Sequence, residues 1–133
     1  MADRFRLKVI TPTSDFYEGD VKMAEFTTTG GNIGVYPGHI PMTAVIAPGL
    51  LRIHEEEEIK EAALMSGFAE ILQDKITILA EVCEWPDEID QKRAEEAKLR
   101  AERRIAQNDE VDLLRAELAL KRALIRLDIK KRY

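Results

Sequence analysis

Arginine is the residue type whose spacing in this chain best suits binding chemistry. Arg93 and Arg100 are seven residues apart, Arg115 and Arg122 repeat that spacing, and Arg126 follows four residues later. Seven residues advance an α-helix by nearly two turns, so the arginines of each helix share a face. Guanidinium groups suit paired contacts with phosphate, and converging arginines would form an anion site. The alternative is a solvated surface of mixed Arg and Glu, which helices of this composition commonly have.

The other reactive residue types do not form a catalytic or metal-binding set. His39 and His54 are the only histidines and lack ligand spacing, and Cys83 is the only cysteine. Gly30 to Gly34 leads into a strand pattern rather than a helix, which argues against a phosphate loop. We expect His39 to serve the loop or a partner contact, His54 to be exposed, and Cys83 to be an inert buried thiol. The sequence thus predicts a protein that is not an enzyme and needs no metal.

The charge balance argues against nucleic acid as a partner. The 133 residues include 20 basic and 25 acidic side chains, for a net charge of −5, so no overall positive field attracts nucleic acid or anionic lipid. No run approaches the roughly 20 apolar residues that cross a bilayer. The N-terminus also lacks the apolar core of a signal peptide. We expect a soluble, non-exported protein.

The composition changes abruptly after Pro86. All 7 glycines and all 5 prolines lie in residues 1–86, whose net charge is −7, whereas residues 87–133 have a net charge of +2. The second part is rich in Ala, Leu, Glu, Lys and Arg, which favours helix. The sequence therefore predicts two domains, residues 1–86 and residues 87–133.

The first domain shows the period of β-strands. Phe5, Leu7 and Val9 alternate with charged residues, as a half-buried strand requires. Further extended segments are expected at 21–23, 33–35, 51–54, 59–65, 68–72 and 76–82, and the acidic residues 55–58 are expected to be a solvated turn. Many short strands without an intervening helix predict an antiparallel β-sandwich.

The second domain shows the period of helices. One stripe consists of Ala94, Ala97, Ala101 and Ile105, and the other of Leu113, Ala116, Leu120, Ala123 and Leu127. The polar segment 107–110 between them is short enough to predict an antiparallel two-helix hairpin, in which Arg93 lies opposite Arg126. Asp109 is expected to cap the second helix. Because alanine seams bury little area, we expect the hairpin to be marginally stable and mobile.

Several motifs, taken in order along the chain, resemble one known family. The motifs are Val-Ile-Thr-Pro at 9–12, Gly-Asn-Ile-Gly-Val-Tyr-Pro-Gly-His-Ile-Pro at 31–41, Ser-Gly-Phe at 66–68, Ile-Thr-Ile-Leu-Ala at 76–80 and Arg-Ala-Glu-Leu-Ala-Leu-Lys-Arg-Ala at 115–123. Together they resemble the epsilon subunit of the F-type ATP synthase, and the resemblance spans the whole chain.

The resemblance implies a non-catalytic rotor subunit that couples proton flow to ATP synthesis. It implies that the β-sandwich docks on the gamma subunit and the ring of c subunits, and we assign the contact to Gly38, His39, Ile40 and Pro41. It also implies a hairpin that either folds back or extends along gamma into the alpha–beta catalytic head and blocks ATP hydrolysis. Such a subunit would lie at the cytoplasmic face of a bacterial cell membrane, peripheral to it through the complex.

The resemblance further implies a nucleotide site. The segment Ile89-Asp90-x-x-Arg93-Ala94 matches a motif through which some bacterial members bind ATP on the folded hairpin. The residues carried over by position are Glu84, Ile89, Asp90, Arg93, Ala94, Arg100, Arg122 and Arg126. We add Arg103 and Arg115, which the hairpin geometry places opposite each other. The expected ligand is ATP, with or without magnesium, and no other cofactor is expected.

A free-standing nucleotide-sensing regulatory protein is the alternative function, because the hairpin by itself would allow it. Such a sensor need not bind gamma, so co-purification with gamma would separate the two possibilities.

Overall fold

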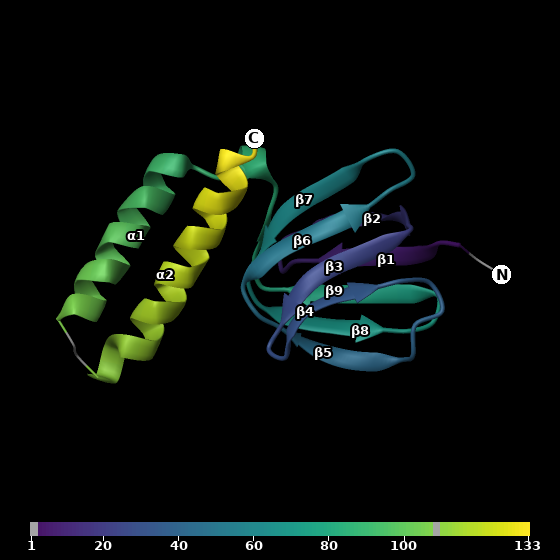
Figure 1. Cartoon of the computed structure of the whole chain (residues 1–133), viewed down its shortest axis with the longest axis horizontal. Helices are drawn as coiled ribbons and strands as arrows, with labels where there is room; N and C mark the ends of the chain where they lie inside the picture. The colour runs from purple at the N-terminus through teal and green to yellow at the C-terminus, as the bar shows by residue number, and fades with distance from the viewer. Residues whose placement is uncertain (1–2, 108–109) are drawn as a thin grey trace. The chain divides into compact units, whose positions relative to one another are not determined.

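The computed structural model describes residues 3–107 and 110–133 and forms two compact units, which divide after Glu84 (Figure 1). The first unit consists of strands and the second of helices. The expected cap at Asp109 lies outside the described residues.

Ten strands make up the described part of the first unit. They are β1 (Phe5–Ile10), β2 (Asp15–Val21), β3 (Met23–Thr28), β4 (Gly31–Val35), β5 (Met42–Ile46), β6 (Gly49–His54), β7 (Ile59–Leu64), β8 (Gly67–Ile71), β9 (Lys75–Ala80) and β10 (Cys83–Glu84). The sequence patterns did not predict β2 or β5.

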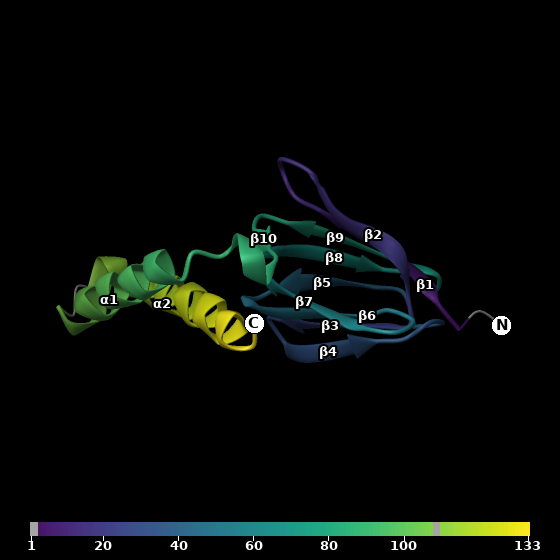
Figure 2. The same ribbon diagram turned by 90° about the horizontal axis from the view of Figure 1, so that it is seen from above.

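These strands form one hydrogen-bonded path in the order β10-β7-β6-β3-β5-β8-β9-β1-β2, with β4 paired to β3. Figure 2 shows the path folded into two facing layers, which confirms the β-sandwich. The two halves of the path join where β3 meets β5, through the single register pair Thr28 and Ile46. The described strand pairs are antiparallel except for β1 with β9, which is parallel.

The apolar period of two places one face of each strand in the core. Phe5 and Leu7 of β1 are buried, whereas Arg6 between them is exposed. The other large side chains buried in this unit include Val21, Phe26, Leu51, Ile53, Leu64, Met65, Ile71, Ile76 and Ile78. Cys83 is 8% exposed, as expected of a buried thiol.

Neighbouring side chains hold the first residue of the acidic turn 55–58, so the expectation of a solvated turn was wrong for Glu55, whereas Glu56 is exposed as expected. The Tyr17 hydroxyl of β2 donates a hydrogen bond to Glu55, and Lys60 Nζ lies 3.6 Å from the same carboxylate. Glu56 forms an ion pair with Arg4. Burial and the hydrogen bond to Glu55 raise the pKa of Tyr17 above its ordinary value.

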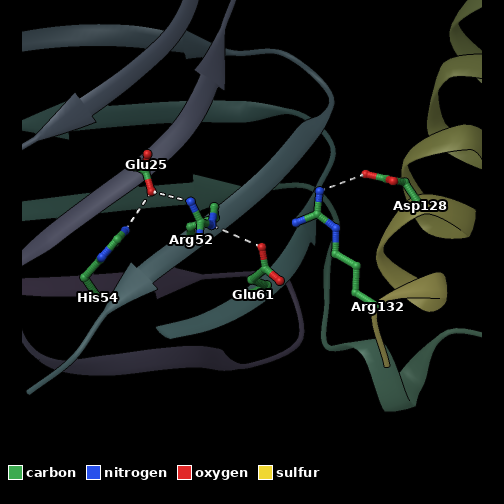
Figure 3. A network of polar contacts seen from close by, with 6 residues as sticks. All are labelled: Glu25, Arg52, His54, Glu61, Asp128 and Arg132. Carbon is green, nitrogen blue, oxygen red and sulfur yellow. Dashed lines mark hydrogen bonds and ion pairs between the residues drawn. The ribbon is translucent and has the colours of Figure 1, made fainter. Parts of the chain in front are cut away.

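A chain of polar contacts crosses the outer face of β3, β6 and β7 (Figure 3). The side chain of His54 lies 2.6 Å from Glu25. Arg52 donates to Glu25 at 3.2 Å and to Glu61 at 3.1 Å. The expectation that His54 is exposed was therefore wrong: its side chain is 23% exposed, because β3 presents a carboxylate beside it.

The second unit is the expected helical hairpin. A short 3₁₀ turn, η1 (Pro86–Glu88), precedes α1 (Gln91–Ala106) and α2 (Glu110–Lys131), which lie side by side (Figure 1). Asp90 caps α1, since its side chain accepts a hydrogen bond from the Arg93 N–H at 3.1 Å. Arg132 pairs with Asp128 one turn earlier at 3.6 Å (Figure 3).

The seam between the helices is built from small residues. Ala94 and Ala101 of α1 and Ala116 and Ala123 of α2 are each at most 4% exposed. The leucines predicted for the same stripe of α2 are only half-buried. The predicted seam is thus confirmed.

Candidate nucleotide site and docking surface

Each buried alanine of the hairpin seam is preceded by an arginine. The pairs are Arg93-Ala94, Arg100-Ala101, Arg115-Ala116 and Arg122-Ala123. One residue turns an α-helix by about 100°, so when the alanine faces the other helix, the arginine lies on one flank of the seam. All four arginines therefore occupy the same flank of their own helix.

The residues that follow the seam alanines show which flanks of the two helices lie on the same side of the hairpin. Glu95 follows a seam alanine in α1, and Leu124 follows one in α2, and both line a groove of 610 Å³ between the helices. Glu95 and Leu124, which follow seam alanines, thus lie on one side of the hairpin. The arginines, which precede seam alanines, therefore lie on the other side. The structure thus brings the arginines of both helices to one side of the hairpin.

Among these four arginines, Arg122 has a buried hydrogen-bond donor, its Nε, without an acceptor in the described part of the chain. A buried donor without a partner costs about 1–3 kcal/mol, and more when the group is charged. A phosphate oxygen at this position would supply the missing acceptor.

The motif that opens α1 has mostly structural contacts in this structure. Asp90 is exposed, and one of its carboxylate oxygens is occupied by the helix cap. Ile89 is 5% exposed and Ala94 is 4% exposed, so both leave little surface for a nucleoside. The second carboxylate oxygen of Asp90 is available to a ligand without competition from the cap.

Three of the expected site residues stand apart from the arginine flank or have other contacts. Arg103 is two positions after Ala101, about 200° round α1, and points away from α2. Glu84 belongs to β10 of the first unit, where it pairs with Ala63. Arg126 is half-buried and interacts within the structure.

The expected docking residues form the loop between β4 and β5. Gly38 has a φ of +81°, and its N–H donates to the Gln73 carbonyl at 2.8 Å, which anchors the loop. The ring Nδ1 of His39 lies 2.7 Å from the Ile40 carbonyl oxygen. Ile40 is 78% exposed, and Pro41 beside it is also exposed. The loop therefore presents an apolar tip.

An exposed apolar row continues across the sheet, and the sequence patterns missed it. Val45 pairs with Phe68, and Phe68 pairs with Leu79, and these three side chains are 45%, 56% and 53% exposed. Each lies next to a buried apolar residue and so breaks the alternation of its strand. That break was the available signal, because an apolar residue at an outward position has no core to fill.

The structure supplies two further results for the described residues. No cluster of His, Cys, Asp and Glu among them could hold a metal ion. Neither of the described helices is apolar over a length that would cross a bilayer.

A sandwich joined to a hairpin of two helices matches a pair of family models. Residues 4–86 match the beta-sandwich domain of the ATP synthase Delta/Epsilon chain, and residues 87–131 match its long alpha-helix domain. The chain belongs to the family of ATP synthase epsilon chains, which are non-catalytic stalk subunits of the complex.

Curated bacterial relatives cover nearly the whole chain. It is 47% identical to the ATP synthase epsilon chain of Caldanaerobacter subterraneus subsp. tengcongensis over 100% of this chain and 98% of that one. It is 44% identical to the epsilon chain of Clostridium kluyveri over 98% of this chain and 100% of that one.

Solved structures share the fold at low sequence identity. A chain in the cryo-EM structure of the Euglena gracilis mitochondrial ATP synthase OSCP/F1/c-ring has a TM-score of 0.85 and 21% identity, over 96% of this chain and 81% of that one. A chain in the central stalk/c-ring structure of the Tetrahymena thermophila mitochondrial ATP synthase has a TM-score of 0.55 and 15% identity, over 68% of this chain and 69% of that one.

Proposed function

We propose that this chain is a rotor subunit of a proton-translocating ATP synthase that couples rotation to ATP synthesis and restrains ATP hydrolysis through its hairpin. The partners are the gamma subunit and the c-subunit ring, and the alpha–beta head when the hairpin extends. Family membership and the bacterial relatives support this function and a position at the cytoplasmic face of the cell membrane. The Euglena and Tetrahymena structures, which contain c-rings, are consistent with these partners.

Docking on the rotor is supported by the exposed apolar row Val45, Phe68 and Leu79. Three neighbouring strands present apolar side chains to solvent, which is typical of a protein interface. We assign the row to gamma and the loop tip at Ile40 to the ring.

Replacement of Phe68 tests the docking surface. An aromatic anchor at an interface often carries 2 kcal/mol or more, so Phe68→Ala should weaken binding to immobilised gamma about tenfold or more. Glu70 is exposed on the same strand but outside the apolar row, and Glu70→Ala serves as the control. Equal affinities of the two variants would mean that gamma binds another face of the β-sandwich.

ATP binding to the folded hairpin is supported chiefly by the unpartnered Arg122 Nε on the arginine flank. In this proposal Arg93, Arg100, Arg115 and Arg122 hold the phosphates, and Arg126 completes the set. The free oxygen of the Asp90 carboxylate accepts a hydrogen bond from the ribose or the adenine amino group. Arg103 points away from this flank and is left out of the site.

Calorimetry of the isolated chain with ATP tests the site. A hydrogen bond between charged groups contributes about 1.5–3 kcal/mol, so Arg122→Ala should weaken ATP binding about tenfold or more. Arg103→Ala removes the same charge from the outer side of α1 and should leave the affinity unchanged. If the parent does not bind ATP, or if both variants bind it equally well, the proposed nucleotide site is contradicted.

ATP would act by stabilising the folded hairpin over the extended, inhibitory one. Arginines from both helices converge only in the antiparallel arrangement, so the folded form binds ATP better, and a ligand shifts an equilibrium by that difference. At 100 times its dissociation constant, ATP contributes about 2.7 kcal/mol to the form that it prefers. That amount is large for a small two-helix unit with an alanine seam.

A further inference from the structure

A polar contact joins the two sides of the hairpin at its open end, away from the connection between the helices. Lys130 Nζ, in the last turn of α2, donates a hydrogen bond of 3.0 Å to the Pro86 carbonyl oxygen of η1. The two residues are 44 positions apart in the sequence and the contact is partly buried. Both belong to the second unit.

The recorded partner of the Lys130 ammonium group is this carbonyl. The structure records no ion pair between its ammonium group and a carboxylate of the described residues, whereas Lys60 in the first unit pairs with two. The Pro86 carbonyl also accepts the Ile89 N–H at 3.2 Å. This oxygen therefore joins α2 to the turn that leads into α1.

The contact exists only while the hairpin is closed. It connects the segment before α1 with the end of α2, and separation of the helices at their open end breaks it. Ile89 and Ile129, which are 5% and 0% exposed, are also buried at this end. The partly buried hydrogen bond from the charged Lys130 adds to this burial a directional contact that exists only in the closed arrangement.

The same contact fixes the start of the nucleotide motif. Ile89 and Asp90 follow Pro86 by three and four residues, and the Asp90 side chain caps α1. When the Pro86 carbonyl is held against α2, the position of Asp90 at the start of α1 is restrained as well.

We propose that Lys130 is a positioning residue that latches the hairpin in its folded state and orders the Ile89-Asp90 turn. Its regulatory consequence rests on the proposed function, in which the folded state binds ATP and the extended state inhibits hydrolysis. The latch itself acts in the isolated chain without nucleotide.

Amide hydrogen exchange of the full chain without ATP tests the latch. Lys130→Met keeps the aliphatic stem but removes the donor, and amides in 88–94 and in the last turn of α2 should exchange about tenfold faster. Lys131→Met removes the same charge from the adjacent, exposed position and should change exchange less than twofold. Lys130→Arg, which keeps a charged donor, should restore most of the protection.

The pattern of exchange separates a latch from general loss of stability. Equal protection in the Lys130→Met and Lys131→Met variants would overturn the proposal. Faster exchange throughout the β-sandwich of the Lys130→Met variant would also overturn it, because the effect would then not belong to the hairpin.

A second measurement separates the latch from the proposed function. In the reconstituted complex at low ATP, the Lys130→Met chain should inhibit hydrolysis more strongly than the Lys131→Met chain, because its hairpin opens more often. If exchange responds as expected but hydrolysis is the same with both chains, the latch stands and the inhibitory role of the hairpin fails.

Discussion

Tyr17 is a residue whose ionisation the fold alters. It lies on β2, near one end of the strand path, and bonds to Glu55 in the turn after β6. Lys60 Nζ lies 5.9 Å from the centre of its ring. The side chain thus ties an edge strand to the acidic turn, and the hydroxyl must keep its proton to donate to the carboxylate.

The stability contributed by Tyr17 should disappear at alkaline pH. Its pKa is raised in the folded state, so above the ordinary tyrosine pKa of about 10 the unfolded chain releases the proton first. The advantage of the parent over Tyr17→Phe is therefore fully present below about pH 10 and declines as the pH rises toward the folded-state pKa.

Urea unfolding of both proteins at a series of pH values from neutral to alkaline measures this difference. The expected result is a larger unfolding free energy for the parent at neutral pH and convergence of the two curves in alkali. A constant difference across the series would contradict the assignment to this hydroxyl.

Residue-level chemistry was only partly predictable. The spacing of the arginines predicted that those of each helix share a face, because helical period depends on local sequence alone. The contact of His54 with Glu25 was not predictable, because β3 and β6 are far apart in sequence and their register sets the pairing. Arg103 was assigned by its distance from the turn, which ignores its direction around α1.

At the scale of elements, the close approach of α1 and α2 depends on alanine. Ala101 is 2% exposed in the seam, and a larger side chain there would push the helices apart. Ala106, at the end of α1, is exposed. The same substitution at the two positions therefore separates packing from helix propensity.

Ala101→Leu should destabilise the hairpin by about 1–3 kcal/mol, the usual cost of overpacking a tight contact. Ala106→Leu should change its stability by less than about 0.5 kcal/mol. Denaturant unfolding followed by helical circular dichroism measures both. A stabilising effect of Ala101→Leu would mean that the seam has unfilled space.

The elements that the sequence failed to predict share a cause. β2 contains Asp15, Glu18 and Asp20 and little apolar alternation, because it is an edge strand. β5 has apolar residues on both faces, since Val45 belongs to the exposed row. Period-two patterns detect strands with one buried and one solvated face, and these two strands do not have that form.

At the scale of the whole molecule, assembly and regulation are assigned to separate units. The strand pairings of the first unit are completed by Glu84, so a chain that ends after Pro86 should fold and still bind gamma. A complex with this shortened chain should hydrolyse ATP faster than one with the full chain, because it lacks the hairpin to which we assign inhibition. Assays of both complexes check this, and equal rates would contradict an inhibitory hairpin.

The parallel pairing of β1 with β9 has a consequence for the order of events during synthesis. Leu7 and Val9 lie beside Ile76 and Ile78. The first strand to leave the ribosome therefore cannot complete its pairing until nearly the last strand of its domain has been synthesised. Until then it can pair only with β2, as an isolated hairpin of marginal stability. Pairing across so long a stretch of chain is slow, and the β-sandwich becomes complete only as translation reaches the two helices.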